Sequence, residues 1–286
     1  MKFAFCLFKH FPSSGLSRDF QRILTECQNR GHETEVFVST WEGSKPERTE
    51  ITVLGDWIDN FSPNHVKDRR YYLSLQKKLN AKPFDAVIGF NKMPGLDVYY
   101  GADICYVRRT EQHPAILKLG RRYKRRKSFE AAVFGLESKT LILSLSERQK
   151  SEYQEHYFTP NERFHLLPPT LDTRFSPIAD RAGEREKLRQ ELDIPVKDLL
   201  LMFIGSGFAT KGLDRVIDAL ASLPQGLQKR ARLIVVGDDD ESQYRKQAER
   251  LKVSGQVRFL GGRSRTDIPK LLAAGDLMVH PAYGEN

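Results

Sequence analysis

Residues 199–220, LLLMFIGSGFATKGLDRVIDAL, hold the pattern that decides the fold. An apolar run over 199–204 is followed by two glycines, which permit a tight turn, and by an amphipathic segment that starts at Leu213. The apolar run is typical of a buried strand and the amphipathic segment of a helix. Repeated strand–turn–helix units of this kind form parallel sheets with helices on their faces.

The same alternation continues in both directions along the chain. In the first half, we predict strands at residues 3–8, 35–39, 85–90, 102–107 and 140–144. The helix after the first strand should end at Gly31, and Ser146 with Gln149 should open the helix that runs through Tyr157. In the second half, we predict helices at 183–192, 213–223, 242–251 and 266–274, and further strands at 233–236, 257–260 and 277–280.

A proline-rich segment, LLPPTLDTRFSP at 166–177, interrupts this alternation. We therefore predict an α/β fold with two Rossmann-like, doubly wound parallel-sheet domains, at residues 1–168 and 169–286. A doubly wound sheet would normally continue into another helix and strand after the one predicted at 277–280. We expect the second domain to be incomplete for this reason.

Composition excludes several classes of protein. With 286 residues, 40% of them hydrophobic, the chain can bury a sizeable core and is not disordered by composition. Cys6, Cys27 and Cys105 are widely spaced in apolar surroundings, which indicates buried thiols in a reducing cytosol and no zinc site. No apolar stretch approaches the ~18 residues of a membrane span, and the N-terminal apolar run is too short for a signal peptide.

The net charge of +9 is concentrated in residues 108–127, which hold nine Lys or Arg and one acid, Glu111. This window belongs to a basic segment, 106–134, which as a helix would place Ile116, Leu119 and Tyr123 on one stripe. A basic amphipathic helix is typical of a protein that lies on an anionic membrane. The cations expected to bind the membrane are Lys118, Arg121, Arg122, Lys124, Arg125, Arg126 and Lys127. Nucleic acid is disfavoured because no recognition helix or aromatic platform accompanies the charges. A solvated face whose apolar stripe faces the core is the remaining alternative.

The turn at 204–212 is the clearest candidate for binding chemistry. Backbone N–H groups, a helix dipole and Lys211 converge there, an arrangement that suits a diphosphate. The order Lys-Gly excludes a nucleoside-triphosphate loop, and Thr210 stands where a dinucleotide fingerprint has its third glycine. The alternative is an ordinary turn with a solvated lysine.

Further candidates lie at the carboxyl ends of predicted strands, where α/β proteins form binding crevices. Gly15 and Asp19 follow the first strand, and Asp19 taken alone is better explained as an acid in the first turn of a helix. Asp103 falls inside a presumed buried strand, where an unpaired carboxylate is costly. Asp103 is either a base or hydroxyl acceptor, or a strand-end Asp that caps a loop. Arg174 either reaches a phosphate or is an exposed arginine of the linker, and Glu285 either accepts sugar hydroxyls or is solvated. His280 is interpreted as a structural histidine.

Several stretches together resemble the bacterial lipopolysaccharide core glucosyltransferases, a group of retaining glycosyltransferases with the GT-B fold. They are FPSSGLSRDF (11–20), WEG (41–43), FNKMPGLDVYYGADICY (90–106), LLPP (166–169), IGSGFATKGLDR (204–215) and HPAYGE (280–285). The resemblance implies transfer of glucose, with retention, from UDP-glucose to an inner-core heptose of a lipid-anchored acceptor. It also implies a peripheral protein on the cytoplasmic face of the inner membrane, with the basic segment as the docking region.

The resemblance assigns roles to individual residues. Lys211 and Arg174 match positions that neutralise the departing diphosphate without a metal or another cofactor, and Gly15 matches a close approach to the donor. Asp19 and Asp103 match the reaction centre, with Asp103 expected to deprotonate the acceptor hydroxyl. Glu285 matches the first residue of a Glu-x7-Glu pair that binds the donor. Because the sequence ends before the second glutamate, we expect weak donor binding or an inactive chain.

Two alternatives remain open at this point. One is the same chemistry with a different nucleotide sugar, since none of these residues distinguishes the epimers of a hexose. The other is a non-catalytic protein that binds a membrane surface and is built on a degenerate transferase scaffold.

Overall fold

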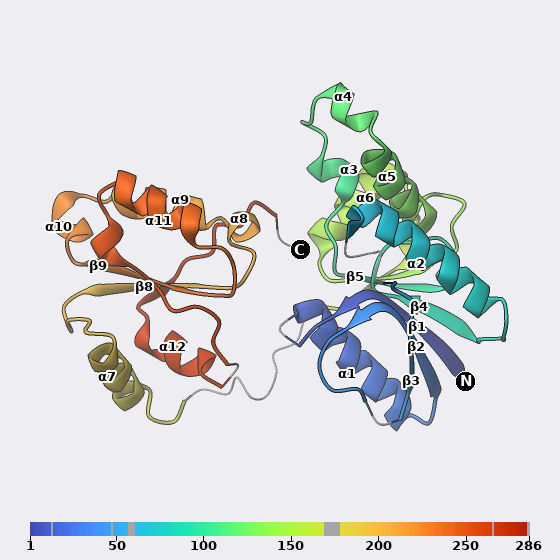
Figure 1. Cartoon of the computed structure of the whole chain (residues 1–286), viewed down its shortest axis with the longest axis horizontal. Coiled ribbons are helices and arrows are strands. Elements are labelled where there is room, and N and C mark those ends of the chain that lie inside the picture. Colours follow the sequence, from blue (N-terminus) through green and yellow to red (C-terminus); the bar gives the residue numbers. More distant parts are fainter. Residues whose placement is uncertain (13, 47, 57–60, 169–177, 265, 285–286) are drawn as a thin grey trace. The chain divides into compact units, whose positions relative to one another are not determined.

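The computed structural model describes all residues except 13, 47, 57–60, 169–177, 265 and 285–286. The chain forms two compact units, residues 1–169 and 170–285, which are described separately below (Figure 1). Among the described residues, no helix combines the length and the apolar composition needed to cross a membrane.

The first unit contains a seven-stranded sheet in which every pairing is parallel. Its strand order is β3-β2-β1-β4-β5-β6-β7, and the order reverses at β1, as in doubly wound folds. The strands are β1 (Lys2–His10), β2 (Glu33–Trp41), β3 (Glu50–Val53), β4 (Ala86–Gly89), β5 (Val98–Gly101), β6 (Leu141–Ser144) and β7 (Phe164–Leu166). The predicted α/β class and parallel sheet are therefore confirmed for this unit.

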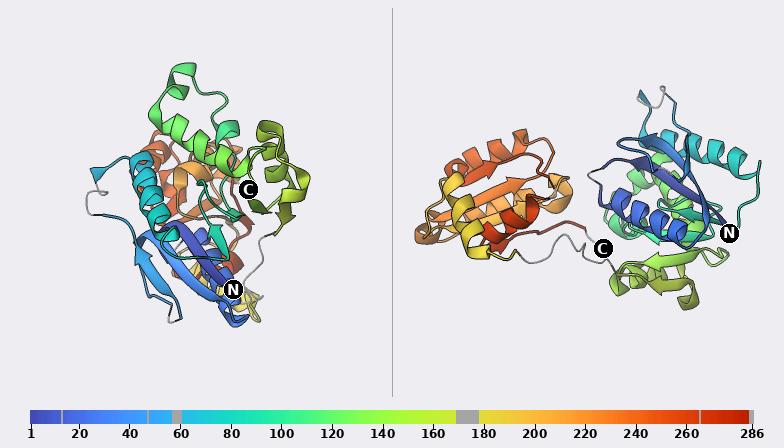
Figure 2. Two further views of the ribbon diagram at one scale, coloured as in Figure 1. Left: turned by 90° about the vertical axis from the view of Figure 1, so that its right-hand side faces the viewer. Right: turned by 90° about the horizontal axis from the view of Figure 1, so that it is seen from below.

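Helices cover both faces of this sheet (Figures 1 and 2). On one face, α1 packs Phe20 against Phe5 of β1, with ring centroids 5.9 Å apart. A larger aromatic core, which includes Tyr99 and Phe134, fills the opposite face. The helices of the unit are α1 (Gly15–Asn29), α2 (Asn64–Leu79), α3 (Tyr106–Arg109), α4 (Ala115–Lys118), α5 (Arg121–Phe134) and α6 (Glu147–Tyr157), with a short 3-10 turn, η2 (Asn161–Arg163).

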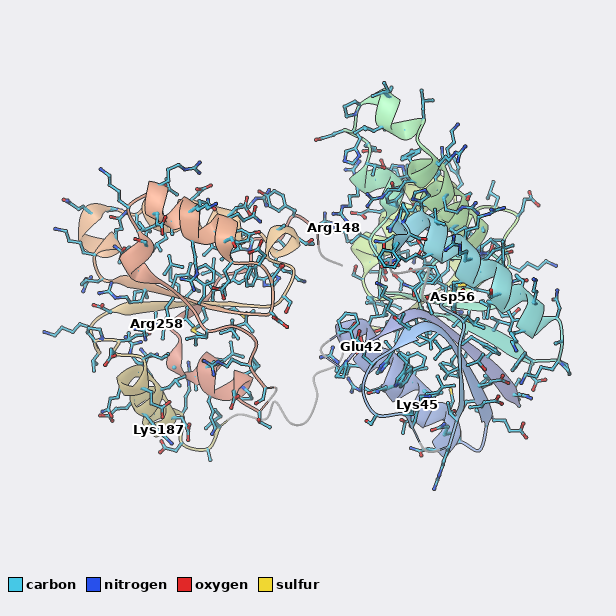
Figure 3. All side chains as sticks on the ribbon, viewed as in Figure 1. Glu42, Lys45, Asp56, Arg148, Lys187 and Arg258 are labelled. Atoms are coloured by element: carbon cyan, nitrogen blue, oxygen red, sulfur yellow. The ribbon has the colours of Figure 1, made fainter. Side chains whose placement is uncertain are left out.

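The second unit has a four-stranded parallel sheet of order β10-β9-β8-β11. Helices α9 and α11 pack together on one face, and α7 packs with α12 on the other (Figure 1). The strands are β8 (Leu199–Ile204), β9 (Ala231–Val236), β10 (Val257–Phe259) and β11 (Leu277–Met278). The helices are α7 (Arg181–Glu191), α8 (Phe208–Lys211), α9 (Leu213–Ala221), α10 (Gln225–Gln228), α11 (Ser242–Arg250) and α12 (Ile268–Ala274), with a 3-10 turn, η4 (Ser254–Gln256). Arg258 of β10 donates to the carbonyl of Leu192 beyond α7 at 2.7 Å (Figure 3).

The structure corrects one predicted strand and adds elements that were not predicted. The strand expected at 102–107 is wrong, because β5 ends at Gly101 and the chain then forms a loop and α3. Helix α2 was not predicted, because its sequence is largely polar and it buries only Tyr71 and Leu75. The short strands β3 and β7 were also missed.

The predicted helix caps agree with the structure. Ser146 accepts a hydrogen bond from the backbone N–H of Gln149, as expected for the start of α6. Gly31 has a φ of +79° just beyond the end of α1, a conformation that favours glycine. The helix-start and helix-stop signals were therefore reliable at both places.

The cysteines differ in burial, which corrects the expectation that all three are buried. Cys6 and Cys105 are buried, whereas Cys27 on α1 is partly exposed. Burial raises the pKa of Cys6 well above its usual range, and burial together with Glu130 raises that of Cys105 to about 12. Burial also raises the pKa of Cys27.

These differences predict the order in which the thiols react. A raised pKa leaves less of the reactive thiolate at pH 8. In the folded chain, only Cys27 should therefore react with an aromatic disulfide reagent, more slowly than free cysteine, and Cys27→Ser should abolish that phase. Denaturant should expose the other two. Reaction of Cys6 or Cys105 without unfolding would contradict this prediction.

Candidate functional site

Asp103 lies in the loop that follows β5, and two side chains of α6 form hydrogen bonds with the main chain of this loop. Gln149 Nε2 donates to the carbonyls of Gly101 and Asp103, at 2.6 and 3.0 Å. Tyr153 donates its hydroxyl to the same Asp103 carbonyl at 2.9 Å. The backbone at Asp103 is thus fixed by contacts that leave its carboxyl group uninvolved.

Asp103 was predicted to lie within a buried strand, and this is wrong. It lies in the loop, half-buried, with one carboxyl oxygen 3.5 Å from the hydroxyl of Tyr99. Asp19 on α1 accepts a hydrogen bond from Tyr100 at 3.0 Å and contacts Arg18 at 3.3 Å. Since successive residues of a strand point to opposite faces, Tyr99 and Tyr100 contact the two predicted carboxylates on opposite faces of β5, and only the bond from Tyr100 is short.

Glu130 organises the other end of the same loop, and sequence analysis did not select it. Its carboxylate, on α5, is fully buried and forms an ion pair with Lys92 at 2.5 Å. It also accepts from the backbone N–H groups of Tyr106 and Val107, at 2.7 and 3.1 Å, and from the hydroxyl of Tyr157 at 2.9 Å. The sequence carries a signal for this role, because Glu130 is the one acid within the otherwise apolar stretch at 129–134.

A cavity of about 440 Å³ opens beside this loop in the first unit. Asp103 contributes to its wall, as do Arg125 and Arg126 of α5 and Phe8 and Lys9 of β1. The structure therefore brings together one predicted catalytic residue and two cations that were assigned to membrane binding. Asp19 does not line this cavity.

The basic segment is not one continuous helix as predicted. Helices α4 and α5 are separated at Gly120, which precedes the first turn of α5. Of the predicted apolar stripe, Ile116 and Leu119 are 75 and 69% exposed, so the alternative in which the stripe faces the core is wrong for them, whereas Tyr123 is partly buried with its ring 5.7 Å from that of Tyr106. Leu117 is 58% exposed. Among the cations, Arg121, Arg122, Lys124 and Lys127 are exposed, Lys118, Arg125 and Arg126 are half-buried, and Lys118 donates to the Glu111 carbonyl at 2.6 Å.

In the second unit, the turn after β8 is built as two glycine bends around α8. Gly207 and Gly212 have φ of +78° and +76°, and a β-carbon on Gly212 would lie 2.2 Å from the carbonyl oxygen of Pro281. A β-carbon on Gly205 would lie within 4.0 Å of both His280 and Lys211. The turn therefore gathers Lys211 and the segment after β11 at the carboxyl edge of the sheet.

Several partners of this turn were not predicted. The backbone N–H of Phe208 in this turn donates to Asp239 at 2.8 Å. Tyr283 donates its N–H to Thr210 at 2.9 Å and its hydroxyl to Asp214 at 2.5 Å. His280 packs its ring parallel to Phe203, with centroids 5.9 Å apart, which agrees with a structural histidine.

For three remaining candidates the structure gives no contact with another residue of the site. Arg174 and Glu285 lie outside the described residues. Gly15 is exposed, and a β-carbon there would meet no atom within 4 Å. The described part of the chain contains no group of three His, Cys, Asp or Glu residues able to hold a metal ion.

Comparison with known proteins decides the family. Residues 13–175 match the family described as Glycosyltransferase Family 4, and residues 184–286 match Glycosyl transferases group 1. The lipopolysaccharide glucosyltransferase WaaG of Escherichia coli K12 is 41% identical over 285 residues, which cover 99% of this chain and 74% of that protein. The chain belongs to the WaaG family of glycosyltransferases.

Solved structures extend this result to the fold. The crystal structure of WaaG superimposes with a TM-score of 0.86 at 40% identity, over 99% of this chain and 75% of that one. HepE from Anabaena, solved in complex with UDP-glucose, has a TM-score of 0.68 at 19% identity over 99% of this chain and 74% of its own. The two parallel sheets of this glycosyltransferase are those of the GT-B fold.

A more distant relative matches only part of the glycosyltransferase. The D-inositol 3-phosphate glycosyltransferase of Corynebacterium glutamicum is 28% identical over 148 residues, which are 49% of this chain and 35% of that protein. The WaaG family is therefore the informative comparison for function.

Proposed function

We propose that this chain transfers glucose, with retention of configuration, from UDP-glucose to an inner-core heptose of lipopolysaccharide. The observation that carries the proposal is the 41% identity to a lipopolysaccharide glucosyltransferase along 99% of the chain. The same region includes both the Asp103 loop and the Lys211 turn.

The donor side of the reaction falls to the second unit. Lys211 lies beside Gly205 at the carboxyl edge of β8, where its ammonium can neutralise charge that develops on the departing diphosphate. Arg174 shares this task, and Glu285 contacts the donor sugar. A fixed cation performs this stabilisation without a metal ion or another cofactor.

The acceptor side falls to the first unit. Asp103 is half-buried in the wall of the cavity and takes the proton of the attacking hydroxyl. Asp19 lies near the reaction centre under the hydrogen bond from Tyr100, and Gly15 leaves open space for the donor.

The basic segment supports attachment to the cytoplasmic face of the inner membrane, where the lipid-anchored acceptor would be reached. Exposed Ile116, Leu117 and Leu119 lie next to the exposed cations of α5. Apolar side chains can insert at the headgroup boundary, and each nearby cation contributes about 1 kcal/mol on an anionic leaflet.

A direct assay separates this proposal from its rivals. The purified chain is incubated with heptose-terminated lipopolysaccharide and either UDP-glucose or UDP-galactose, with and without EDTA. Transfer of glucose with retained anomeric configuration, unaffected by EDTA, is the expected result. Preference for galactose would indicate a different donor, and vesicle binding without transfer would support the non-catalytic alternative.

Lys211→Ala tests the donor site. Loss of one preorganised charge that faces the leaving group should lower kcat by about 10²-fold or more. The control is Lys229→Ala, which removes an exposed lysine from the same unit and should leave turnover unchanged. Equal activity of the Lys211 variant and the unmodified chain would contradict the assignment.

A further inference from the structure

The cavity beside Asp103 carries more positive charge than the proposed reaction requires. Six cations line it: Lys92, which is paired with Glu130, and five others, Lys9, Lys67, Arg109, Arg125 and Arg126. We refer to the space that they enclose as the basic cavity. It lies wholly within the first unit, so its walls come from one sheet and from the helices and loops around it.

The carboxylates in the wall leave these charges largely unbalanced. Glu130 is already paired with Lys92, which also lines the cavity. Among the described residues, none of the five cations has a carboxylate oxygen within 4.0 Å. Only Asp68 and Asp103 remain in the wall to oppose them. The excess charge is therefore available to a ligand.

The two arginines of α5 are held in positions that suit an oxyanion. The guanidinium of Arg125 lies 5.4 Å from the ring centroid of Phe129, and that of Arg126 lies 5.8 Å from that of Tyr106. The Nε atom of Arg126 is buried without a hydrogen-bond partner in the described structure. Arginine presents a planar fork of donors that matches carboxylate or phosphate oxygens. A buried donor of this kind gains most when an acceptor arrives.

We propose that the basic cavity binds an acidic group of the acceptor saccharide, a phosphate or a carboxylate, and so holds the accepting hydroxyl against Asp103. This inference rests on the proposed function, since it assigns the acceptor to the cavity that Asp103 lines. It deepens that function by making a negative charge on the acceptor a requirement for recognition. Two of the seven cations attributed to membrane contact thereby act on the substrate.

Arg126→Gln is the decisive variant. Its binding to a deacylated, water-soluble inner-core oligosaccharide is measured by calorimetry, in parallel with its binding to UDP-glucose. Loss of a charged, buried hydrogen bond should weaken oligosaccharide binding by about 10- to 100-fold. Binding of UDP-glucose and the melting temperature should stay unchanged. Arg126→Lys keeps the charge without the planar fork of donors. Its affinity for the oligosaccharide should lie between those of the unmodified chain and of Arg126→Gln.

The matched control is Arg148→Gln on α6 in the same unit (Figure 3). Arg148 is 80% exposed and does not line the basic cavity, so its loss should change neither affinity. The source of the charge follows from two modified oligosaccharides, one dephosphorylated and one with its carboxyl groups reduced. One modified oligosaccharide should bind weakly to the unmodified chain and equally weakly to Arg126→Gln. The acidic group that this oligosaccharide lacks is the group bound in the cavity.

Three results would overturn the inference. They are unchanged oligosaccharide affinity in Arg126→Gln, a selective loss of UDP-glucose affinity, and a complete absence of oligosaccharide binding by the unmodified chain. The transferase proposal is judged separately by transfer from UDP-glucose. Charge-dependent oligosaccharide binding without any transfer would refute the transferase proposal and would still support anion binding in the basic cavity.

Discussion

Asp103→Asn should lower the rate of glucose transfer by about 10²- to 10⁴-fold, the usual contribution of a positioned general base. The substitution keeps the size of the side chain. It also leaves the loop in place, because Gln149 and Tyr153 bind the main-chain carbonyl of Asp103 and not its carboxyl group. Steady-state transfer from UDP-glucose, with the melting temperature as a check on folding, measures the effect.

Two companion variants make this result specific. Tyr99→Phe removes only a 3.5 Å contact to the carboxyl group and should change the rate little. Asp19→Asn removes the negative charge and the basicity of the carboxylate that accepts from the Tyr100 hydroxyl, and it keeps an amide oxygen able to accept that bond. A loss of less than about tenfold in Asp103→Asn, together with a larger loss in Asp19→Asn, would transfer the role of base to Asp19.

Glu130→Gln should destabilise the first unit by about 3 kcal/mol, because it leaves the ammonium of Lys92 without its buried partner. Glutamine also cannot accept all the bonds that the carboxylate receives from Tyr106, Val107 and Tyr157. For a unit of this size the melting temperature should fall by roughly 6–12 °C. Calorimetric unfolding of the whole chain measures it.

The control for this prediction is Glu26→Gln on α1, which removes an exposed ion pair with Arg30 and should cost at most about 1 kcal/mol. The double variant Glu130→Gln with Lys92→Met removes both charges and should recover part of the loss. Equal melting temperatures for Glu130→Gln and Glu26→Gln would show that the buried carboxylate is not the anchor of the loop.

The sequence was sufficient to predict the parts of the fold that depend on local pattern. Apolar runs such as 199–204 and 233–236 form buried strands because consecutive large apolar side chains are typical of strands that are covered on both faces. Glycine and serine caps were equally clear, since Gly31 and Ser146 act on their own neighbours in the chain.

Features that depend on distant partners could not be predicted. The segment 102–107 is apolar enough for a strand, but Glu130 captures the N–H groups at its end and directs it into α3. In the same way, seven cations along one segment gave no sign that Arg125 and Arg126 line a cavity with residues of β1 and α2. The sequence indicated which types of residue the site contains. Which of these residues lie together in one cavity depends on the tertiary structure.

The position of β8 in its sheet has a consequence for the timing of synthesis. This strand pairs with β9 on one side and with β11, at residues 277–278, on the other. At about 5–20 residues per second on the ribosome, one edge of β8 waits for roughly 4–15 s after translation of the strand before its partner exists. The first unit, whose last strand ends at Leu166, needs no residue made after that point to close its sheet. A nascent chain should therefore be able to pair every strand of the first sheet while β8 still presents one unpaired edge.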